Sequence, residues 1–579
     1  MTHTVVWRRF RSLLFASVIL SGVDYVAGMM ECIIGGSLLG GQAVVGLTLL
    51  APIMPLLTFI GLLIVSGSMT LYAYAGGHAD EEEMNRVYSQ AVILCAVVGV
   101  LLTILMVAAK DSILSYWDVS ADVAAYASEY YDGVAWRPAV YFVSQILLSL
   151  LLAEGEVKRS VVAAVTQFSV TVAAALFLVP RIGILGLSLG TTLGFVADCF
   201  AKASFLFSER CPIRLSFWLS AGKIMEMLRT SFGMALANLW IAILPFAMTS
   251  YLLSAFGEEV LIVFGVINSI LGVAIAIFEG VEQAMQPMVC MYYSEGNLRG
   301  MEKTMKIGAG SAALLGASLS VLFLAMSGVL PGWFGAEDET TATMARAAMA
   351  AFLPFLALRA LGMVYAAYSA YTGRIVSALT LQGLLHLALP FLCAVLGGQL
   401  FGLTGAWVGL GASGLLALGA DWIVSRLAAQ RNPNLEGILM LDGRQLENQL
   451  SYDCMSVEDE VMATAKQAER DLIAFGLPED KCRLAGFFIE ELGMNAVERA
   501  EGHAPFEVET TLCREEDTIT LIVRDNGKVQ PGALSADITN PDLGLESFRM
   551  YVVSQVASKL DSRSYIMIGG ENRTALRLK

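Results

Sequence analysis

Several acidic residues interrupt stretches of the sequence that are otherwise apolar. Asp24 and Glu31 lie in the first such stretch, and Glu279 and Glu282 lie near the end of a later one, followed by the neutral polar residue Gln283. An acidic side chain at mid-bilayer costs about 2.5–3.5 kcal/mol on insertion scales, so it is rare there without a function. Because Asp24 and Glu31 are seven residues apart, they share one helix face. They predict a site for an ion or a substrate, whereas Glu282 has an alternative role as a span-end carboxylate that reaches headgroup water.

A second group of residues that could do chemistry lies near the C-terminus. Glu491 and Asn495 are four residues apart, which places them on one face of a predicted helix. Arg499 follows one turn later, and Asp525 and Gly527 enclose an Asp-Asn-Gly turn after a predicted strand. Carboxylate and amide oxygens are ligands that Mg²⁺ accepts, and the spacing suits a helix face that meets phosphate groups. The alternative for Glu491 is a solvated helix face.

The elements that position these residues belong to two chemically different parts of the chain. The 579 residues are 56% hydrophobic and only 15% charged, which is far from the composition of soluble proteins. Residues 432–579 carry a net charge of −11, out of −15 for the whole chain. The composition therefore predicts a membrane domain followed by an acidic soluble domain. The basic clusters are short and sit at span ends, so the sequence indicates no nucleic-acid partner.

Twelve stretches reach the length of about 20 apolar residues that a bilayer-spanning helix needs. They lie near 12–38, 43–73, 88–109, 128–152, 160–180, 183–206, 229–255, 258–290, 303–330, 344–371, 375–397 and 402–427. Asp80 aligns with Asn297 at an offset of 217 residues, and Gly183 aligns with Gly402 at an offset of 219. Two apolar halves of one repeat are typical of transporters. We therefore expect an α-helical membrane protein with two six-helix repeats, at 1–217 and 218–431.

Basic residues in short loops predict the orientation of the spans. Sixteen Lys and Arg residues lie on the side of the N-terminus, and only Lys110, Arg137, Arg181 and Arg346 lie on the opposite side. This bias predicts a multi-pass protein of the cell (inner) membrane, surrounded by membrane lipid, with both termini in the cytoplasm.

Residues 450–579, which follow a polar linker at 432–449, show the pattern of a soluble α/β sandwich. Helical periodicity covers 457–477 and 480–500, and a further helix is expected at Leu545–Leu560. Alternating apolar residues predict four strands, at 506–514, 517–525, 564–569 and 574–579.

The membrane part resembles the multidrug and toxic compound extrusion (MATE) family. The family's Gly-x-x-Gln-small-x-Gln-Pro run occurs here as Gly280–Pro287, followed by a turn at Asn297. In the first half, Glu31 occupies the position where the family usually carries an aspartate, and a small-residue run then ends at Pro52. The resemblance covers about residues 12–427. It implies a cation-coupled exporter in which Glu31 takes part in coupling to Na⁺ or H⁺.

The fifth span departs from the family. The Asn/Asp pair that is common there is missing, and the span offers only Gln167, Ser169 and Thr171 as polar residues.

The soluble domain resembles the ATP-binding domains of gyrases, Hsp90 and histidine kinases (GHKL), and most closely the anti-sigma-factor serine kinases. The resemblance implies that Glu491 is a general base and that Asn495 binds Mg²⁺. It also implies that Arg499 meets a phosphate oxygen and that Asp525 accepts a hydrogen bond from the adenine amine. Gly527 would then allow the base to approach closely.

The same resemblance extends to the last helix and strand. Gly544 would open the helix whose N-terminus holds phosphate, and Thr574 would support the adenine. The second glycine of the Asp-x-Gly-x-Gly motif is replaced by Val529. The family implies Mg·ATP as the ligand and a STAS-type regulatory protein as a partner.

These features favour a cation-coupled secondary efflux transporter of small molecules, with cationic compounds among the candidates, and with a cytoplasmic ATP-binding regulatory domain. One alternative is an enzyme, a membrane-anchored protein-serine kinase. Another is a flippase of a lipid-linked substrate. An ATP-driven pump is disfavoured because the sequence contains no Walker-type Gly-x-x-x-x-Gly-Lys-Ser/Thr.

Overall fold

The computed structural model describes the chain in ten segments. These are residues 5–77, 81–117, 119–153, 156–207, 217–336, 338–500, 505–515, 518–527, 561–567 and 571–578. The chain divides into two compact units. The larger unit comprises 13–284 and 308–424, and the smaller one comprises 1–12, 285–307 and 425–579.

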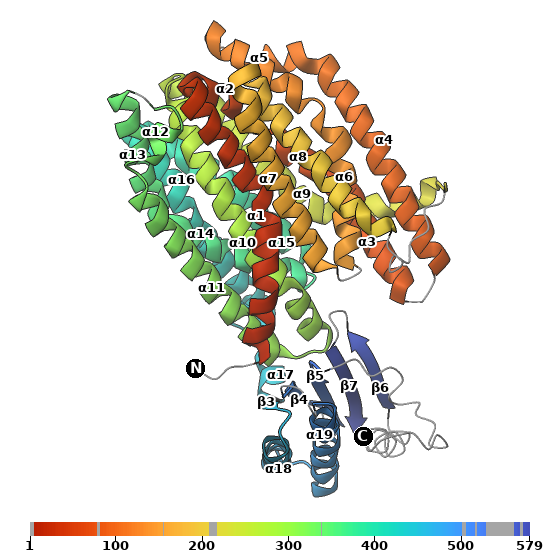
Figure 1. Cartoon of the computed structure of the whole chain (residues 1–579). Helices are drawn as coiled ribbons and strands as arrows, with labels where there is room; N and C mark the ends of the chain where they lie inside the picture. The colour runs from red at the N-terminus through yellow and green to blue at the C-terminus, as the bar shows by residue number, and fades with distance from the viewer. Residues whose placement is uncertain are drawn as a thin grey trace. The chain divides into compact units, whose positions relative to one another are not determined.

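The larger unit is a bundle of long helices (Figure 1). In the first half of the chain the α-helices are α1 Val5–Leu39, α2 Gly41–Leu49, α3 Ile53–Gly77, α4 Glu81–Leu114, α5 Ala121–Val134, α6 Arg137–Ala153, α7 Val157–Ile182 and α8 Leu185–Ala203. In the second half they are α9 Ala221–Phe256, α10 Val260–Ser294, α11 Leu298–Ala325, α12 Leu330–Trp333, α13 Glu339–Phe352, α14 Leu356–Tyr371, α15 Ile375–Gly383 and α16 Leu389–Arg431. A π-helical turn, Leu384–Ala388, joins α15 to α16.

Nine helices of the described residues are long and apolar enough to cross a membrane, or ten if the α5–α6 pair, bent by 46°, counts as one span. This result supports a multi-pass helical membrane protein, while twelve spans remain a prediction. The ten possible spans and the twelve predicted ones differ in two places. The helix α8 is not among the nine, and residues 375–431 count as one span although α16 bends at Phe401 and Gly402.

Glycines at matching positions give both halves the same backbone breaks. Gly40 ends α1 with φ 89° and ψ 177°, and Gly257 ends α9 with φ 89° and ψ 179°. Gly183 (φ 65°, ψ −148°) separates α7 from α8, and Gly402 (φ 65°, ψ −158°) bends α16. Only glycine adopts these conformations readily. The two pairs are separated by 217 and 219 residues, which are the offsets of the predicted repeat.

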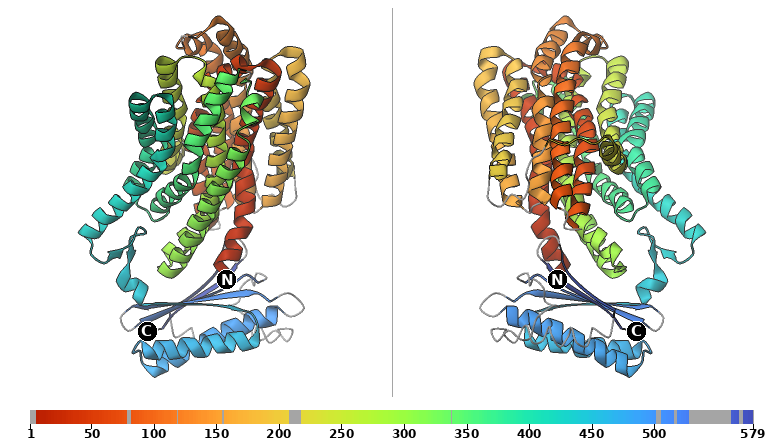
Figure 2. Two further views of the ribbon diagram at one scale, coloured as in Figure 1. Left: turned by 90° about the vertical axis from the view of Figure 1, so that its left-hand side faces the viewer. Right: turned by 90° about the vertical axis from the view of Figure 1, so that its right-hand side faces the viewer.

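The smaller unit contains a five-stranded antiparallel sheet with two helices on one face (Figure 2). Its strand order is β3-β4-β5-β7-β6, with β3 Gln449–Met455, β4 Glu507–Glu515, β5 Thr518–Asp525, β6 Asp561–Met567 and β7 Glu571–Leu578. The helices are α18 Glu458–Ala474 and α19 Glu479–Arg499. The predicted α/β layers and the two helices agree with this structure, whereas β3 is an additional strand. The predicted helix at Leu545–Leu560 lies outside the described residues.

The residues predicted as a linker, 432–449, form short elements of secondary structure. They contain two short paired strands, β1 Leu435–Glu436 and β2 Leu441–Asp442, and the helix α17 Gly443–Glu447. The carboxylate of Asp442 caps α17 by accepting hydrogen bonds from two backbone N–H groups.

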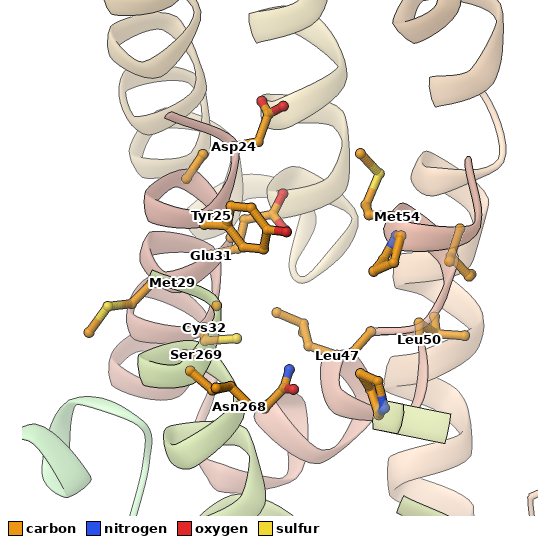
Figure 3. A pocket seen from close by; sticks show the side chains of 18 of the residues that line it. Asp24, Tyr25, Met29, Glu31, Cys32, Leu47, Leu50, Met54, Asn268 and Ser269 are labelled. Atoms are coloured by element: carbon orange, nitrogen blue, oxygen red, sulfur yellow. The ribbon is translucent and has the colours of Figure 1, made fainter. Parts of the chain in front are cut away.

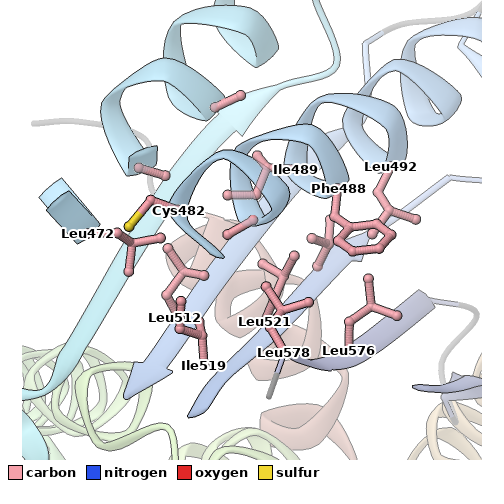
Figure 4. Packing of buried hydrophobic residues seen from close by; sticks show 14 of the residues in the cluster. Leu472, Cys482, Phe488, Ile489, Leu492, Leu512, Ile519, Leu521, Leu576 and Leu578 are labelled. Atoms are coloured by element: carbon pink, nitrogen blue, oxygen red, sulfur yellow. The ribbon is translucent and has the colours of Figure 1, made fainter. Parts of the chain in front are cut away.

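Apolar side chains bind the helices to the sheet (Figure 4). Buried residues recur along α19 at a spacing of three or four, including Phe488, Ile489 and Leu492. They pack on side chains that include Leu512 of β4 and Leu576 of β7. Full burial of one such side chain contributes about 1.5–3 kcal/mol, so this layer fixes the helix that carries the candidate nucleotide residues.

The opposite face of the sheet is polar and nevertheless buried. Alternate side chains of a strand point to opposite faces, so Val508 and Leu512 of β4 face the helices while Glu507, Glu509 and Thr511 face away. The last three residues are at most 3% exposed. A buried charge is stable only when it is paired, so this face requires partners.

Residues 1–12 and 285–307, which belong to the same unit, supply those partners. Arg9 Nη1 lies 3.2 Å from Glu509 Oε2, and the hydroxyl of Tyr292 donates to Glu509 Oε1 at 3.0 Å. Arg524 of β5 lies opposite Glu509 in the register and contacts both Glu509 and Glu295. Burial raises the pKa of the Glu509 carboxyl, and the Arg9 guanidinium opposes that rise.

Candidate functional site

A cavity inside the larger unit brings residues of both halves of the bundle together (Figure 3). Its empty volume is about 1240 Å³, part of which is open to solvent. Most of the wall is apolar and comes from α1, α2, α3, α9 and α10. Its charged and titratable residues are Asp24, Tyr25, Glu31, Cys32, Tyr130, Arg137, Arg359 and His386. A largely apolar cavity with a few polar groups is the usual form of a small-molecule site.

Glu31 is the most extensively hydrogen-bonded acid of this cavity. Its carboxylate accepts a hydrogen bond from the Tyr130 hydroxyl at 2.6 Å and another from Arg137 Nη2 at 3.1 Å. The Thr191 hydroxyl provides a third donor. Glu31 is 5% exposed and Arg137 is 2% exposed. The three donors come from α5, α6 and α8, so the position of Glu31 on α1 is tied to three other helices.

Asp24 lines the same cavity but has a neutral hydrogen-bond donor. Gln167 Nε2 of α7 donates to Asp24 Oδ1 at 2.6 Å. Gln167 is one of the polar residues that the fifth span offers in place of the family's Asn/Asp pair. Asp24 also lies within electrostatic range of the buried ion pair between Lys202 and Asp198, whose Nζ and Oδ2 atoms are 2.5 Å apart. The two predicted acids of α1 thus line one cavity but have separate hydrogen-bond partners.

The other predicted coupling residues lie elsewhere. Glu279, Glu282 and Gln283 of α10 are not among the residues that line this cavity. Glu279 and Glu282 are half-buried, and Gln283 is exposed. The backbone carbonyl of Glu282 accepts a hydrogen bond from the Tyr371 hydroxyl at 3.2 Å.

Three basic residues of the cavity were not identified as site residues from the sequence. Arg137, which the sequence places in a loop opposite the N-terminus, begins α6 and is buried beside Glu31; it therefore carries no information on loop charge. Arg359 of α14 and His386 of the π-helical turn are also buried. Each of these two residues is a basic residue within a predicted apolar span. Such residues are as unusual there as the acids Asp24 and Glu31, so they could have been predicted as site residues in the same way.

The candidate nucleotide residues of the smaller unit lie close together. Arg499 Nε donates to Asn495 Oδ1 at 2.9 Å. The guanidinium also forms a two-point contact with Asp525, at 2.9 Å from Nη1 to Oδ1 and 2.6 Å from Nη2 to Oδ2. The backbone N–H of Gly527 donates to Asp525 Oδ1 at 2.9 Å. Arg499 therefore occupies the carboxylate that would accept the adenine amine.

The fit to a nucleotide is partial on the described residues. Asn495 and Asp525 are buried, and a side chain at Gly527 would collide with Phe506 and Arg499. In this structure the space beside Gly527 is therefore filled by Phe506 and Arg499.

Of the other residues predicted for the nucleotide site, two lie within the part of the chain that the structure describes. Thr574 is buried on β7, opposite Val523 of β5. Glu491 is half-buried on α19. Gly544 and Val529 lie outside the described residues.

Comparison with protein families relates the first part of the chain to the MATE proteins. Residues 18–177 match the model of the MatE family. No curated protein matches the chain.

Solved structures match over a larger part of the chain. An inward-facing conformation of a multidrug resistance MATE family transporter of the MOP superfamily is 21% identical, with a TM-score of 0.64, and the match covers 72% of this chain and 99% of that one. An outward-facing conformation of such a transporter is 20% identical, with a TM-score of 0.61, over 74% and 99% of the two chains.

A MOP superfamily transporter from Pyrococcus furiosus is similar to the same degree. It is 20% identical, with a TM-score of 0.62, over 74% of this chain and 97% of that one. For that protein, the reverse polarity of the binding pocket is described as suggesting a different function. About a quarter of this chain has no counterpart in these structures. The membrane part of the chain has the fold of MATE transporters of the MOP superfamily.

Proposed function

We propose that this protein is a cation-coupled secondary transporter of the MATE type that exports small molecules, with Na⁺ or H⁺ as the coupling ion. The observation that supports this most strongly is Glu31, a buried carboxylate that lines the cavity of a MATE-like fold. Buried acids in a membrane protein mark ion pathways and proton relays. Asp24 on the same helix is the second coupling residue.

The contacts of Glu31 provide a way to link ion binding to a change of structure. A proton or Na⁺ on the Glu31 carboxylate weakens its pairing with Arg137, which lies 3.1 Å away. Arg137 then loses its carboxylate partner, and α1 is less firmly held to α6. An ion shifts a conformational equilibrium only through such a difference between states.

The smaller unit has a regulatory role in this proposal. Asn495 and Asp525 would hold Mg·ATP, with Glu491, Arg499, Gly527, Gly544 and Thr574 completing the site. Nucleotide binding requires Arg499 to release Asp525, and phosphate is the natural alternative partner for its guanidinium. A STAS-type protein is the proposed partner.

Membrane orientation completes the proposal. The predicted excess of basic residues on the side of the N-terminus supports a protein of the inner membrane with both termini in the cytoplasm. The smaller unit is then exposed to the cellular pool of ATP.

Transport into inverted membrane vesicles under an imposed Na⁺ or H⁺ gradient tests the role of Glu31. We expect Glu31→Gln to lose at least nine-tenths of the gradient-driven uptake, because the neutral amide binds no coupling ion. Glu31→Asp, which keeps the charge, should retain part of it.

A second variant separates coupling from stability. Glu31→Gln leaves Arg137 buried and unpaired, which costs about 3–5 kcal/mol. In Glu31→Gln/Arg137→Gln that penalty is removed, so the melting temperature should recover while transport does not. Full transport by either the single or the double variant would show that Glu31 is not the coupling residue.

A further inference from the structure

The second half of the chain contributes to the cavity a buried positive charge that has no partner among the residues that the structure describes. Arg359 lies in the first turn of α14, lines the cavity and is 2% exposed. Its Nε, Nη1 and Nη2 atoms have no hydrogen-bond partner among the described residues. An arginine side chain remains protonated and carries five N–H donors. A buried guanidinium in this state is strongly destabilising unless another molecule satisfies it.

His386 adds a second polar group to the same wall. It is 6% exposed, lines the cavity, and its Nδ1 atom has no partner within the described part of the chain. His386 and Arg359 lie within electrostatic range of each other. His386 also belongs to the π-helical turn Leu384–Ala388. Single π-helical turns are rare and occur frequently at functional sites.

The acids of the cavity do not neutralise Arg359 in this conformation. Glu31 accepts its hydrogen bonds from Tyr130, Arg137 and Thr191. Asp24 accepts its hydrogen bond from Gln167. The cavity therefore has an acidic side in which the charges are satisfied and a basic side in which they are not.

The rest of the wall indicates what else an occupant must carry. Ile241, Leu244 and Pro245 of α9 and Leu50 and Met54 of the first half are apolar. Burial of apolar surface against these side chains favours binding. An occupant that satisfies both kinds of wall has an apolar body and one oxyanion group.

We propose that Arg359 and His386 form an oxyanion subsite, which binds a carboxylate or phosphate group on an amphipathic substrate. This inference rests on the proposed transport function and narrows its substrate class to compounds with an anionic group. The planar fork of Arg359 suits two-point binding of a carboxylate or a phosphate. A purely cationic compound leaves Arg359 unsatisfied and is a poorer substrate.

A matched pair of dyes tests the subsite directly. Rhodamine 110 carries a free carboxylate, and rhodamine 123 is its methyl ester with the same ring system. Binding to the purified full chain in neutral-lipid nanodiscs is measured by fluorescence anisotropy, without an ion gradient. We expect wild-type protein to bind rhodamine 110 at least tenfold more tightly than rhodamine 123. Equal affinities, or tighter binding of the ester, would overturn the proposal.

Variants assign the preference to the two residues. Arg359→Gln should remove the preference for the carboxylate, and His386→Gln should reduce it. Arg359→Lys keeps the charge in the fold but loses the planar fork, so it should keep only part of the preference. A preference that survives unchanged in Arg359→Lys and in His386→Gln would place the anion elsewhere.

Competition distinguishes the sources of the oxyanion. Displacement of rhodamine 110 by octanoate or octyl phosphate supports a soluble amphipathic substrate and shows which group is preferred. Displacement only by phosphatidylglycerol in the nanodisc would instead assign Arg359 to a lipid headgroup and contradict the proposal. Gradient-driven transport by wild-type protein is measured separately, so a failure of the transport function is distinguishable from a failure of the subsite.

Discussion

At the scale of single residues, the two acids of α1 differ in what an ion must displace. Glu31 has a charged donor, Arg137, and two hydroxyl donors, Tyr130 and Thr191. Asp24 has the neutral amide of Gln167. A cation at Glu31 competes with a guanidinium, whereas a cation at Asp24 does not. Coupling to structural change is therefore expected at Glu31, and Asp24 is expected to raise the local affinity for the ion.

In the smaller unit, Arg499 would compete with a nucleotide for Asp525 and Asn495. Its two-point contact with Asp525 and its bond to Asn495 satisfy the same oxygen atoms that a nucleotide and its metal would use. The sequence resemblance alone assigns all three residues to the ligand. The structure instead joins them to one another.

This contact predicts that Arg499 limits nucleotide affinity. In Arg499→Met the Asp525 carboxylate is no longer engaged by the guanidinium, so we expect Mg·ATP to bind at least tenfold more tightly than to wild type. Asp525→Asn should abolish binding. Calorimetry on the full chain, extended to millimolar nucleotide, measures both. Weaker binding by Arg499→Met would mean that the proposed phosphate contact of Arg499 outweighs its competition for Asp525.

At the scale of elements, glycines define where the helices break. A Cβ atom at Gly402 meets no atom within 4 Å, so only its backbone conformation, φ 65° and ψ −158°, excludes other residues. Gly310 in α11 also has open space around it, but its backbone is helical. The two positions therefore separate backbone strain from packing.

The matched substitutions should have opposite effects on stability. Gly402→Ala forces alanine into a backbone region that costs about 1–3 kcal/mol, and the melting temperature of the purified protein should fall by several degrees. Gly310→Ala should leave it unchanged or raise it, because alanine is favoured in a helix by up to about 1 kcal/mol. A similar fall for both variants would refute the strain at Gly402.

The sequence predicts the elements better than their contacts. Apolar length and alternation locate most spans and four strands of the sheet, because these signals are local. The strand β3 is not predicted although Leu450, Tyr452 and Cys454 alternate with polar residues and pack against the core, because this short run directly follows the predicted polar linker. The pairing of Glu31 with Arg137 involves residues 106 positions apart, and no periodicity reports it. The burial of the charged residues on β4 is not predicted either. Polar residues alternate with apolar ones in the same way when that face of a sheet is exposed to solvent.

At the scale of the whole molecule, the helix α1 contributes residues to both compact units. The first turns of α1 place Arg8 and Arg9 against Glu507 and Glu509 of β4. The same helix continues to Asp24 and Glu31. The pairs of Arg8 and Arg9 tie the start of α1 to β4 within the smaller unit; Arg9 and Glu509 are buried, whereas the Arg8 side chain is 54% exposed.

If the proposed regulation acts through the buried charges of β4, breaking the pairs of Arg524 should uncouple transport from nucleotide. Arg524→Gln leaves Glu509 and Glu295 without their shared guanidinium, so we expect its transport rate to be the same with and without Mg·ATP, while the wild-type rate differs. Arg483→Gln is the control, because Arg483 is 71% exposed on α19. Normal ATP sensitivity in Arg524→Gln would show that the pairs of Arg524 do not transmit the nucleotide state.

We propose that an ion gradient, and not ATP, drives export by this protein. Purified wild-type protein in proteoliposomes, with a fluorescent substrate and an imposed Na⁺ or H⁺ gradient, tests it most directly. We predict that the substrate accumulates against its own gradient without nucleotide, and that an ionophore that dissipates the ion gradient stops this accumulation. Accumulation that persists without any ion gradient and follows the supply of Mg·ATP would contradict the account.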